Sequence, residues 1–142
     1  MAKIMTENKI VDGMDYLKNH ARVYYVTDAG CLSLTVENLL EAEWIGLDIE
    51  TAKQTDHPMA GLNPKVSRVR LVQLYDGKNC LVVDVDRVGL DWLAQLKHKQ
   101  MIAHNAQFED SHLLHAGINL ENLHCSLLMA RVVMVNKNRT LS

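Results

Sequence analysis

The stretch Trp44-Ile45-Gly46-Leu47-Asp48-Ile49-Glu50-Thr51 alternates apolar residues with small or polar ones. Successive side chains of a β-strand point to opposite faces, so this alternation predicts a strand with two unlike faces. One face holds the apolar residues that we expect in the core: Ile45, Leu47 and Ile49. The other face places Asp48 and Glu50 next to each other at the strand end. Adjacent carboxylates repel, so such a pair either lies at a solvated edge or binds a cation.

Strand, turn and helix patterns continue on both sides of this segment. Residues 68–75 and 80–85 are apolar runs around Asp76-Gly77, which predicts a β-hairpin. Residues 51–67 contain both prolines and predict a long loop. The remaining predicted elements are strands at 22–26, 101–104 and 123–125, and helices at 10–19, 33–42, 90–97, 106–116 and from Ser126 onward. Hairpins followed by β-α-β units predict an α/β domain with a mixed sheet and helices on its faces.

Several residues at the expected helix ends have known capping preferences. Ser33 or Thr35 is the expected N-cap of the helix at 33–42, and Asn105 that of the helix at 106–116. Gly117 stands where a residue with positive φ commonly follows a helix.

Length and composition restrict the class of protein. The 142 residues form one domain's length, and 48% apolar with 23% charged residues is ordinary for a globular chain. The longest stretch without Asp, Glu, Lys or Arg, residues 111–120, is far too short to span a membrane, and we see no signal peptide. The net charge of −2 argues against a general nucleic-acid coat protein but is compatible with a nuclease.

The three cysteines, Cys31, Cys80 and Cys125, are odd in number and widely spaced, without a C-x-x-C motif. This pattern argues against a disulfide scaffold and against a cysteine zinc site. It fits a cytoplasmic location, where thiols stay reduced.

A second motif follows the acidic strand at residues 102–109, Ile-Ala-His-Asn-Ala-Gln-Phe-Glu. An apolar strand ending in D-x-E-T, followed by H-N-x-x-F-E, resembles the first two motifs of the DEDD-superfamily 3′–5′ exonuclease domains. Within that superfamily the chain is most similar to the exonuclease domain of family A DNA polymerases and to ribonuclease D. The resemblance covers about residues 23–142 and implies a ribonuclease H-like fold with a five-stranded mixed sheet flanked by helices.

The resemblance implies a chemistry as well as a fold. It suggests hydrolysis of phosphodiester bonds at single-stranded 3′ ends, with DNA favoured over RNA, in a setting such as DNA repair. Two divalent ions, Mg²⁺ or Mn²⁺, roughly 4 Å apart would stabilise the attacking and leaving oxygens, and carboxylates are the hard ligands that such ions prefer. In the resemblance, Asp48 bridges both ions, Glu50 holds one and orients water, and the acid of the second motif supports the other ion.

That acid is Glu109 in this chain, where the family usually has Asp. The extra methylene displaces the carboxylate by about 1 Å or more. Asp110 is the alternative, but it lies about 100° further round the helix, so we favour Glu109. A second departure is Cys125, where relatives often carry Asp, and we expect it to serve in packing.

The family's fourth acid belongs to a Y-x-x-x-D or H-x-x-x-D motif beyond the helix that starts at Ser126. No acidic residue follows Glu121. We therefore expect residues 1–142 to be a single domain without the C-terminal part, with 1–21 a weakly specified extension. Whether the chain is a fragment of a longer protein or lacks the last acid naturally stays open. With three candidate acids, the chain by itself is expected to have little activity.

Substrate contacts are expected from Thr51, Asn105 and Phe108, which belong to the two motifs. Between residues 51 and 70, four basic residues face one acid, so Lys65 and Arg68 are candidates for phosphate binding. A solvated loop is the competing interpretation.

Two other classes of function stay open. One is a catalytically weak or inactive nucleic-acid-binding domain of the same fold, and the other is a structural or interaction module. A zinc site built from His112, His115, His124 and Cys125 has little support, since no other metal spacing accompanies it. The expected partners are a single-stranded DNA or RNA 3′ end, with self-association or a polymerase partner as further options and no membrane.

Overall fold

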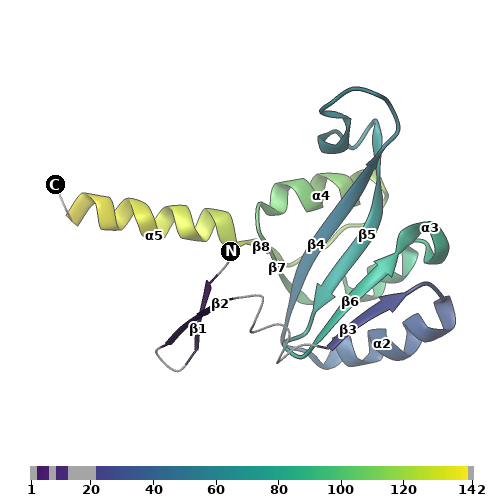
Figure 1. The fold of residues 1–142 in the computed structure, drawn as a ribbon, viewed down its shortest axis with the longest axis horizontal. Coiled ribbons are helices and arrows are strands. Elements are labelled where there is room, and N and C mark those ends of the chain that lie inside the picture. Colours follow the sequence, from purple (N-terminus) through teal and green to yellow (C-terminus); the bar gives the residue numbers. More distant parts are fainter. Residues whose placement is uncertain (1–2, 7–8, 13–21, 141–142) are drawn as a thin grey trace.

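The computed structural model describes residues 3–6, 9–12 and 22–140, and its elements are labelled in Figure 1. The strands are β1 (Lys3–Thr6), β2 (Lys9–Asp12), β3 (Arg22–Val26), β4 (Trp44–Lys53), β5 (Ser67–Tyr75), β6 (Asn79–Asp84), β7 (Gln100–Ala103) and β8 (Leu123–Cys125). The α-helices are α2 (Ala29–Glu41), α3 (Val85–Val88), α4 (Ala106–His115) and α5 (Ser126–Thr140), and the 3₁₀ turns are η1 (Ala60–Leu62) and η2 (Asp91–Leu96).

The main sheet is mixed, as predicted, with the strand order β3-β6-β5-β4-β7-β8. Strands β4, β5 and β6 are antiparallel neighbours, whereas β3, β7 and β8 join the sheet in parallel. The expected count of five strands is wrong by one, because the short β8 pairs with β7 from Met101↔Leu123 to Ala103↔Cys125. The α/β class and the flanking helices are confirmed.

The N-terminal segment differs from its prediction. Strands β1 and β2 form a separate two-stranded antiparallel sheet. The helix expected at 10–19 is therefore wrong at residues 10–12, which belong to β2, and its remainder lies outside the described residues.

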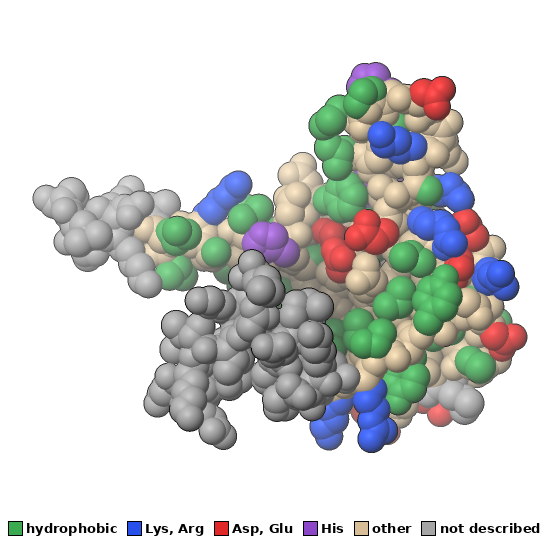
Figure 2. All heavy atoms as spheres, in the orientation of Figure 1, with side chains coloured by type: hydrophobic (Ala, Val, Ile, Leu, Met, Phe, Trp, Pro, Cys, Tyr) green, Lys and Arg blue, Asp and Glu red, His purple; other side chains and the backbone are tan. Residues whose placement is uncertain are grey.

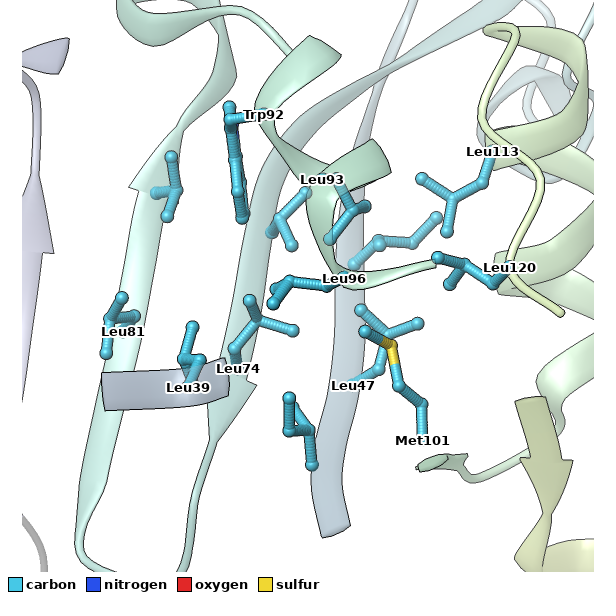
Figure 3. Packing of buried hydrophobic residues seen from close by; sticks show 14 of the residues in the cluster. Leu39, Leu47, Leu74, Leu81, Trp92, Leu93, Leu96, Met101, Leu113 and Leu120 are labelled. Carbon is cyan, nitrogen blue, oxygen red and sulfur yellow. The ribbon is translucent and has the colours of Figure 1, made fainter. Parts of the chain in front are cut away.

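One face of the main sheet forms the core. The apolar set on β4 is buried there as predicted, and α2 and α4 lie behind the strands in Figure 1. Figure 3 shows side chains from these layers meeting, with Leu39 of α2, Leu47 of β4, Leu96 of η2 and Leu113 of α4 among them. Each fully buried Leu contributes on the order of 2 kcal/mol from the area removed from water.

The opposite face of the sheet is open in the view of Figure 2, where hydrophobic side chains reach the surface beside a group of acidic ones. Val23 and Tyr25 of β3 are 69% and 60% exposed on this side. Helix α5 extends away from the sheet in Figure 1. None of the helices in the described part of the chain is both long and apolar enough to cross a membrane.

Local signals explain most element ends. The turn between β5 and β6 is the predicted Asp-Gly hairpin, in which Asp76 Oδ1 accepts from the backbone of Lys78 and Asn79 at 2.8 and 2.7 Å. Gly77 and Gly117 have φ of 101° and 87°, which a residue without a Cβ adopts freely.

Helix α2 starts earlier than predicted. Asp28 is the N-cap, and its carboxylate accepts from the backbone of Gly30 and Cys31. The expected caps Ser33 and Thr35 lie inside the helix, where their hydroxyls donate to carbonyls of the preceding turn. The apolar pattern does not reveal this start, because its first buried residue, Leu32, lies after the helix has begun.

Candidate active site

Strand β4 presents the acidic pair on its open face. Asp48 and Glu50 are exposed, while Leu47 and Ile49 are buried. Asp48 stands opposite Gln73 of β5, and the pairing shifts by one residue between Glu50 and Thr51. Among the described residues no Lys, Arg or His forms an ion pair with either acid. Within the part of the chain that the structure describes, the pair therefore has no fixed counter-charge.

Helix α4 brings a third carboxylate towards this strand. Glu109, in its first turn, is only 3% exposed, and its Oε2 has no hydrogen-bond partner in the described structure. Burial raises the pKa of the Glu109 carboxyl, and the negative charge of Asp48 raises it further. The two carboxylates are thus within electrostatic range, although they come from elements about sixty residues apart. Asp110 is half-buried on the next position round the helix.

The carboxylate oxygens of these acidic residues are suitable ligands for a hard divalent cation. A buried carboxylate oxygen without a donor is rare in folded proteins and is what a cation ligand requires. Asp48, Glu50 and Glu109 are all oxygen donors, the type that Mg²⁺ and Mn²⁺ prefer. However, no three His, Cys, Asp or Glu side chains within the described ranges converge closely enough to form a complete metal site. Glu109 therefore lies within electrostatic range of Asp48, and Glu50 follows Asp48 two positions along the strand.

The basic residues near the site are less available than the sequence suggested. Arg68 donates to both carboxylate oxygens of Asp86, at 3.2 and 2.8 Å. Arg70 does the same to Asp84, at 2.6 and 3.2 Å. Counting charges within residues 51–70 could not detect these acids, which lie on the neighbouring strand and helix. Lys65 is exposed and has no acidic partner in the described part of the chain.

The remaining predicted substrate residues occupy three different environments. Thr51 Oγ1 donates to the carbonyl of Gly61 at 2.8 Å and so ties the long loop to the end of β4. Asn105 precedes α4 with a φ of 63°, a conformation that Asn tolerates better than most residues. Asn105 is the N-cap residue of α4, as predicted, but its exposed side chain makes no capping hydrogen bond. Phe108 is half-buried, and its ring packs on His112.

Two structural features had no clear signal in the sequence. The buried Asp84 is bonded not only by Arg70 but also by the Tyr25 hydroxyl at 2.8 Å. Cys125 does more than pack, because its Sγ accepts from the backbone N–H of Ala106 at 3.4 Å. The backbone N–H of Leu128 is the largest cause that lowers the pKa of this thiol.

No protein-family model matches the sequence, and no curated protein matches it either. Solved structures do. The Trypanosoma brucei RNase D complex with RNA U12 matches 74% of this chain with a TM-score of 0.60 and 20% identity. The chain has the fold of the DEDD 3′–5′ exonuclease domains.

Two other solved structures support this assignment of the fold. The Aedes aegypti Nibbler EXO domain matches 79% of the chain with a TM-score of 0.64 and 16% identity. Brucella melitensis NrnC with bound Mg²⁺ matches 80% with a TM-score of 0.57 and 18% identity. The chain spans 37% of the RNase D chain, 56% of the Nibbler chain and 52% of the NrnC chain.

Proposed function

We propose that this domain is a metal-dependent 3′–5′ exonuclease acting on single-stranded nucleic-acid ends. The observation that carries the proposal is the buried carboxylate oxygen of Glu109, which has no hydrogen-bond partner in the described structure and lies within electrostatic range of Asp48. These residues stand at the acidic positions of the two exonuclease motifs, and the chain has the fold in which those motifs occur. Without a ligand to compensate them, two neighbouring carboxylates would only destabilise the fold.

In this proposal Asp48, Glu50 and Glu109 hold the divalent ions, Mg²⁺ or Mn²⁺. The ions supply charge stabilisation to the phosphoryl oxygens and lower the pKa of bound water. Asp48 and Glu50 lie on β4, an interior strand of the sheet that is paired with β5 and β7. The proposal assigns contacts with the sugar-phosphate backbone of the 3′ end to the Asn105 amide and the Lys65 ammonium, which are both exposed.

The choice of nucleic acid needs a separate argument. The sequence motifs favoured DNA, through their likeness to the exonuclease domains of DNA polymerases. The RNase D structure that matches this chain contains RNA U12. We therefore propose RNA as the first substrate, with DNA as the comparison in every assay.

A second candidate function is nucleic-acid binding without efficient cleavage. The observation that favours it is that no complete three-residue metal site forms within the described residues. Position 109 holds Glu where the family usually has Asp, and this difference also favours binding without efficient cleavage. This alternative keeps the fold and the open surface but assigns the acids a weak role or none.

The deciding experiment is single-turnover digestion of 5′-labelled single-stranded RNA and DNA with Mg²⁺ or Mn²⁺. Single-turnover conditions detect slow cleavage, which matters because a chain with three acids is expected to be weak. We expect stepwise shortening from the 3′ end by the parent chain and none by Asp48→Ala. Asp56→Ala, which removes an exposed acid in the neighbouring loop, is the matched control. Binding without shortening would establish the second candidate, and neither binding nor cleavage would leave an interaction module.

Self-association is a further proposal for the partner of this domain. Val23 and Tyr25 on the open sheet face, and Leu128, Val132 and Met134 on α5, are all more than half exposed. Exposed apolar patches of this kind commonly mark protein contacts. Sedimentation velocity over a range of concentrations tests this, and a monomer at all concentrations would reject it. A polymerase partner stays a prediction from the resemblance.

A further inference from the structure

His112 is a buried titratable side chain that the proposed catalysis does not use. It lies on α4 one turn after Glu109 and is 2% exposed. Its Nδ1 donates to the carbonyl oxygen of Phe108 at 2.9 Å, since a carbonyl oxygen can only accept. Its ring also packs against the Phe108 ring, with the centroids 4.5 Å apart. The side chain is therefore held firmly on its own helix.

The other ring nitrogen connects α4 to β5. His112 Nε2 lies 3.0 Å from Ser67 Oγ, on a residue 45 positions earlier in the sequence. Ser67 is buried at the start of β5, and its hydroxyl also lies 2.8 Å from the carbonyl oxygen of Asn63. The single hydroxyl proton can be donated either to this carbonyl or to Nε2, one at a time. The Asn63 side chain in turn accepts from the backbone N–H of Lys65 at 3.0 Å. A continuous set of polar contacts thus joins the helix, the strand and the loop that carries Lys65.

This connection affects the spacing of the acids. Strand β5 is hydrogen-bonded to β4, the strand that carries Asp48, over most of its length. Glu109 stands three residues before His112 on the helix that Ser67 anchors. If α4 moved along β5 by one residue's rise, about 1.5 Å, the Glu109 carboxylate would move by the same amount relative to Asp48. Misplacement of about 1 Å at an active site can reduce the rate about a hundredfold.

An apolar residue could fill the same space but could not make this connection. A leucine at position 112 would leave the Ser67 hydroxyl without its partner on the helix. Buried polar groups are destabilising unless they are hydrogen-bonded, so a buried histidine and a buried serine facing each other fix one relative position of their elements.

We infer that His112 is a positioning residue, which through Ser67 holds α4 in register with β5 and β4 and so sets the separation of Glu109 from Asp48. The effect of His112 on cation binding rests on the proposed function, whereas the anchoring of α4 to β5 is independent of it. The anchoring and the cation affinity can be measured separately.

The test compares His112→Ala, His112→Gln and Ser67→Ala with the parent chain. His115→Ala is the matched control, because His115 lies on the same helix but is exposed. Amide hydrogen exchange over residues 61–67 and 106–116 measures the anchoring, and calorimetric Mn²⁺ titration measures its consequence. We expect faster exchange in both segments for His112→Ala, with Mn²⁺ affinity about tenfold weaker, the usual size of such indirect effects on metal affinity. Gln retains a donor and an acceptor, so His112→Gln should recover most of both, and the control should behave like the parent.

Several results would overturn the inference. Unchanged exchange in His112→Ala would show that the contact does not anchor α4. Faster exchange with unchanged Mn²⁺ affinity would reduce His112 to a purely structural role. If the parent chain itself failed to bind Mn²⁺, the proposed function would fail, while the exchange data would still decide whether His112 anchors the helix. If His112→Ala does not fold, Ser67→Ala removes the same contact from the other side and gives the same readouts.

Discussion

Two groups of carboxylates lie in the same domain and differ in what surrounds them. Asp84 and Asp86, at the end of β6 and the start of α3, are paired with Arg68 and Arg70 at distances of 2.6 to 3.2 Å. Asp48, Glu50 and Glu109 have no cationic partner among the described residues. Figure 2 shows acidic side chains in both settings on the viewed face, some next to blue basic groups and some without.

The pKa values of Asp84 and Glu109, one from each group, are shifted in opposite directions. Burial alone would raise the pKa of Asp84, but hydrogen bonds from Arg70 and Tyr25 outweigh it and hold the pKa below its ordinary value. Glu109 has no such donors, so burial and the charge of Asp48 raise its pKa. A carboxylate with a fixed counter-charge contributes to stability, whereas one without it is available to a mobile cation. An acidic residue at a strand end can therefore bind a metal cation when no Arg or Lys side chain already neutralises its charge.

The largest effect is expected from Asp48→Ala. Removing this acid takes away a direct cation ligand, and metal charge stabilisation supplies several kcal/mol of barrier reduction. At 1.36 kcal/mol for each tenfold change in rate, cleavage should fall at least about a hundredfold. The fold should be unaffected, because Asp48 is exposed and unpaired. Cleavage by Asp48→Ala at the parent's rate, with Asp56→Ala as reference, would contradict the comparison.

Asp84→Asn should instead reduce stability and leave Mn²⁺ binding unchanged. The side chain of Asp84 is 4% exposed, and the change would leave Arg70 without its main counter-charge. Because the folded pKa of Asp84 is lowered, its stabilisation is present above the ordinary Asp pKa and is lost as the pH falls through the folded value. Melting temperatures measured across this acidic range should converge for parent and variant. A variant as stable as the parent at neutral pH would show that this network is dispensable.

Glu109→Gln should raise stability and weaken Mn²⁺ binding, whereas Asp84→Asn lowers stability and leaves Mn²⁺ binding unchanged. A carboxyl with a raised pKa is ionised at a cost in the folded state, so stability falls as the pH rises from the ordinary Glu pKa through the folded value. The amide avoids this cost, and the variant should melt above the parent at neutral pH but bind Mn²⁺ more weakly. Asp110→Asn is the control, with little change in either property. If Asp110→Asn instead lost Mn²⁺ affinity and Glu109→Gln kept it, the ligand assignment would be reversed.

The smallest expected effect is a difference between Lys65→Ala and Arg68→Ala in the salt dependence of RNA binding. Lys65 has no acidic partner among the described residues, so Lys65→Ala should weaken RNA binding and reduce the slope of log affinity against log salt by about 0.7. Arg68 is already paired with Asp86, so Arg68→Ala should change the slope less. Fluorescence anisotropy at several salt concentrations measures both. Equal slopes for the two variants would show that the Asp86 pair opens to admit phosphate.

The sequence predicted those features that depend on local pattern. Alternation identified β4 and its two faces, and Asp76-Gly77 identified the hairpin between β5 and β6. It could not supply contacts between distant elements, such as Asp86 with Arg68 or Ser67 with His112, because nothing local encodes them. The cap of α2 was missed because Asp28 precedes the apolar pattern. The conformation of Asn105 was missed because a residue before a helix is ordinarily expected in the extended region.

Anomalous diffraction from crystals soaked in Mn²⁺ would locate the bound cation itself. If Asp48 and Glu109 form a cation site and the arginine-paired Asp84 and Asp86 do not, a manganese peak should lie in contact with both Asp48 and Glu109, and none beside Asp84. A peak at the Asp84 group, or no peak near Asp48 at saturating Mn²⁺, would contradict this assignment.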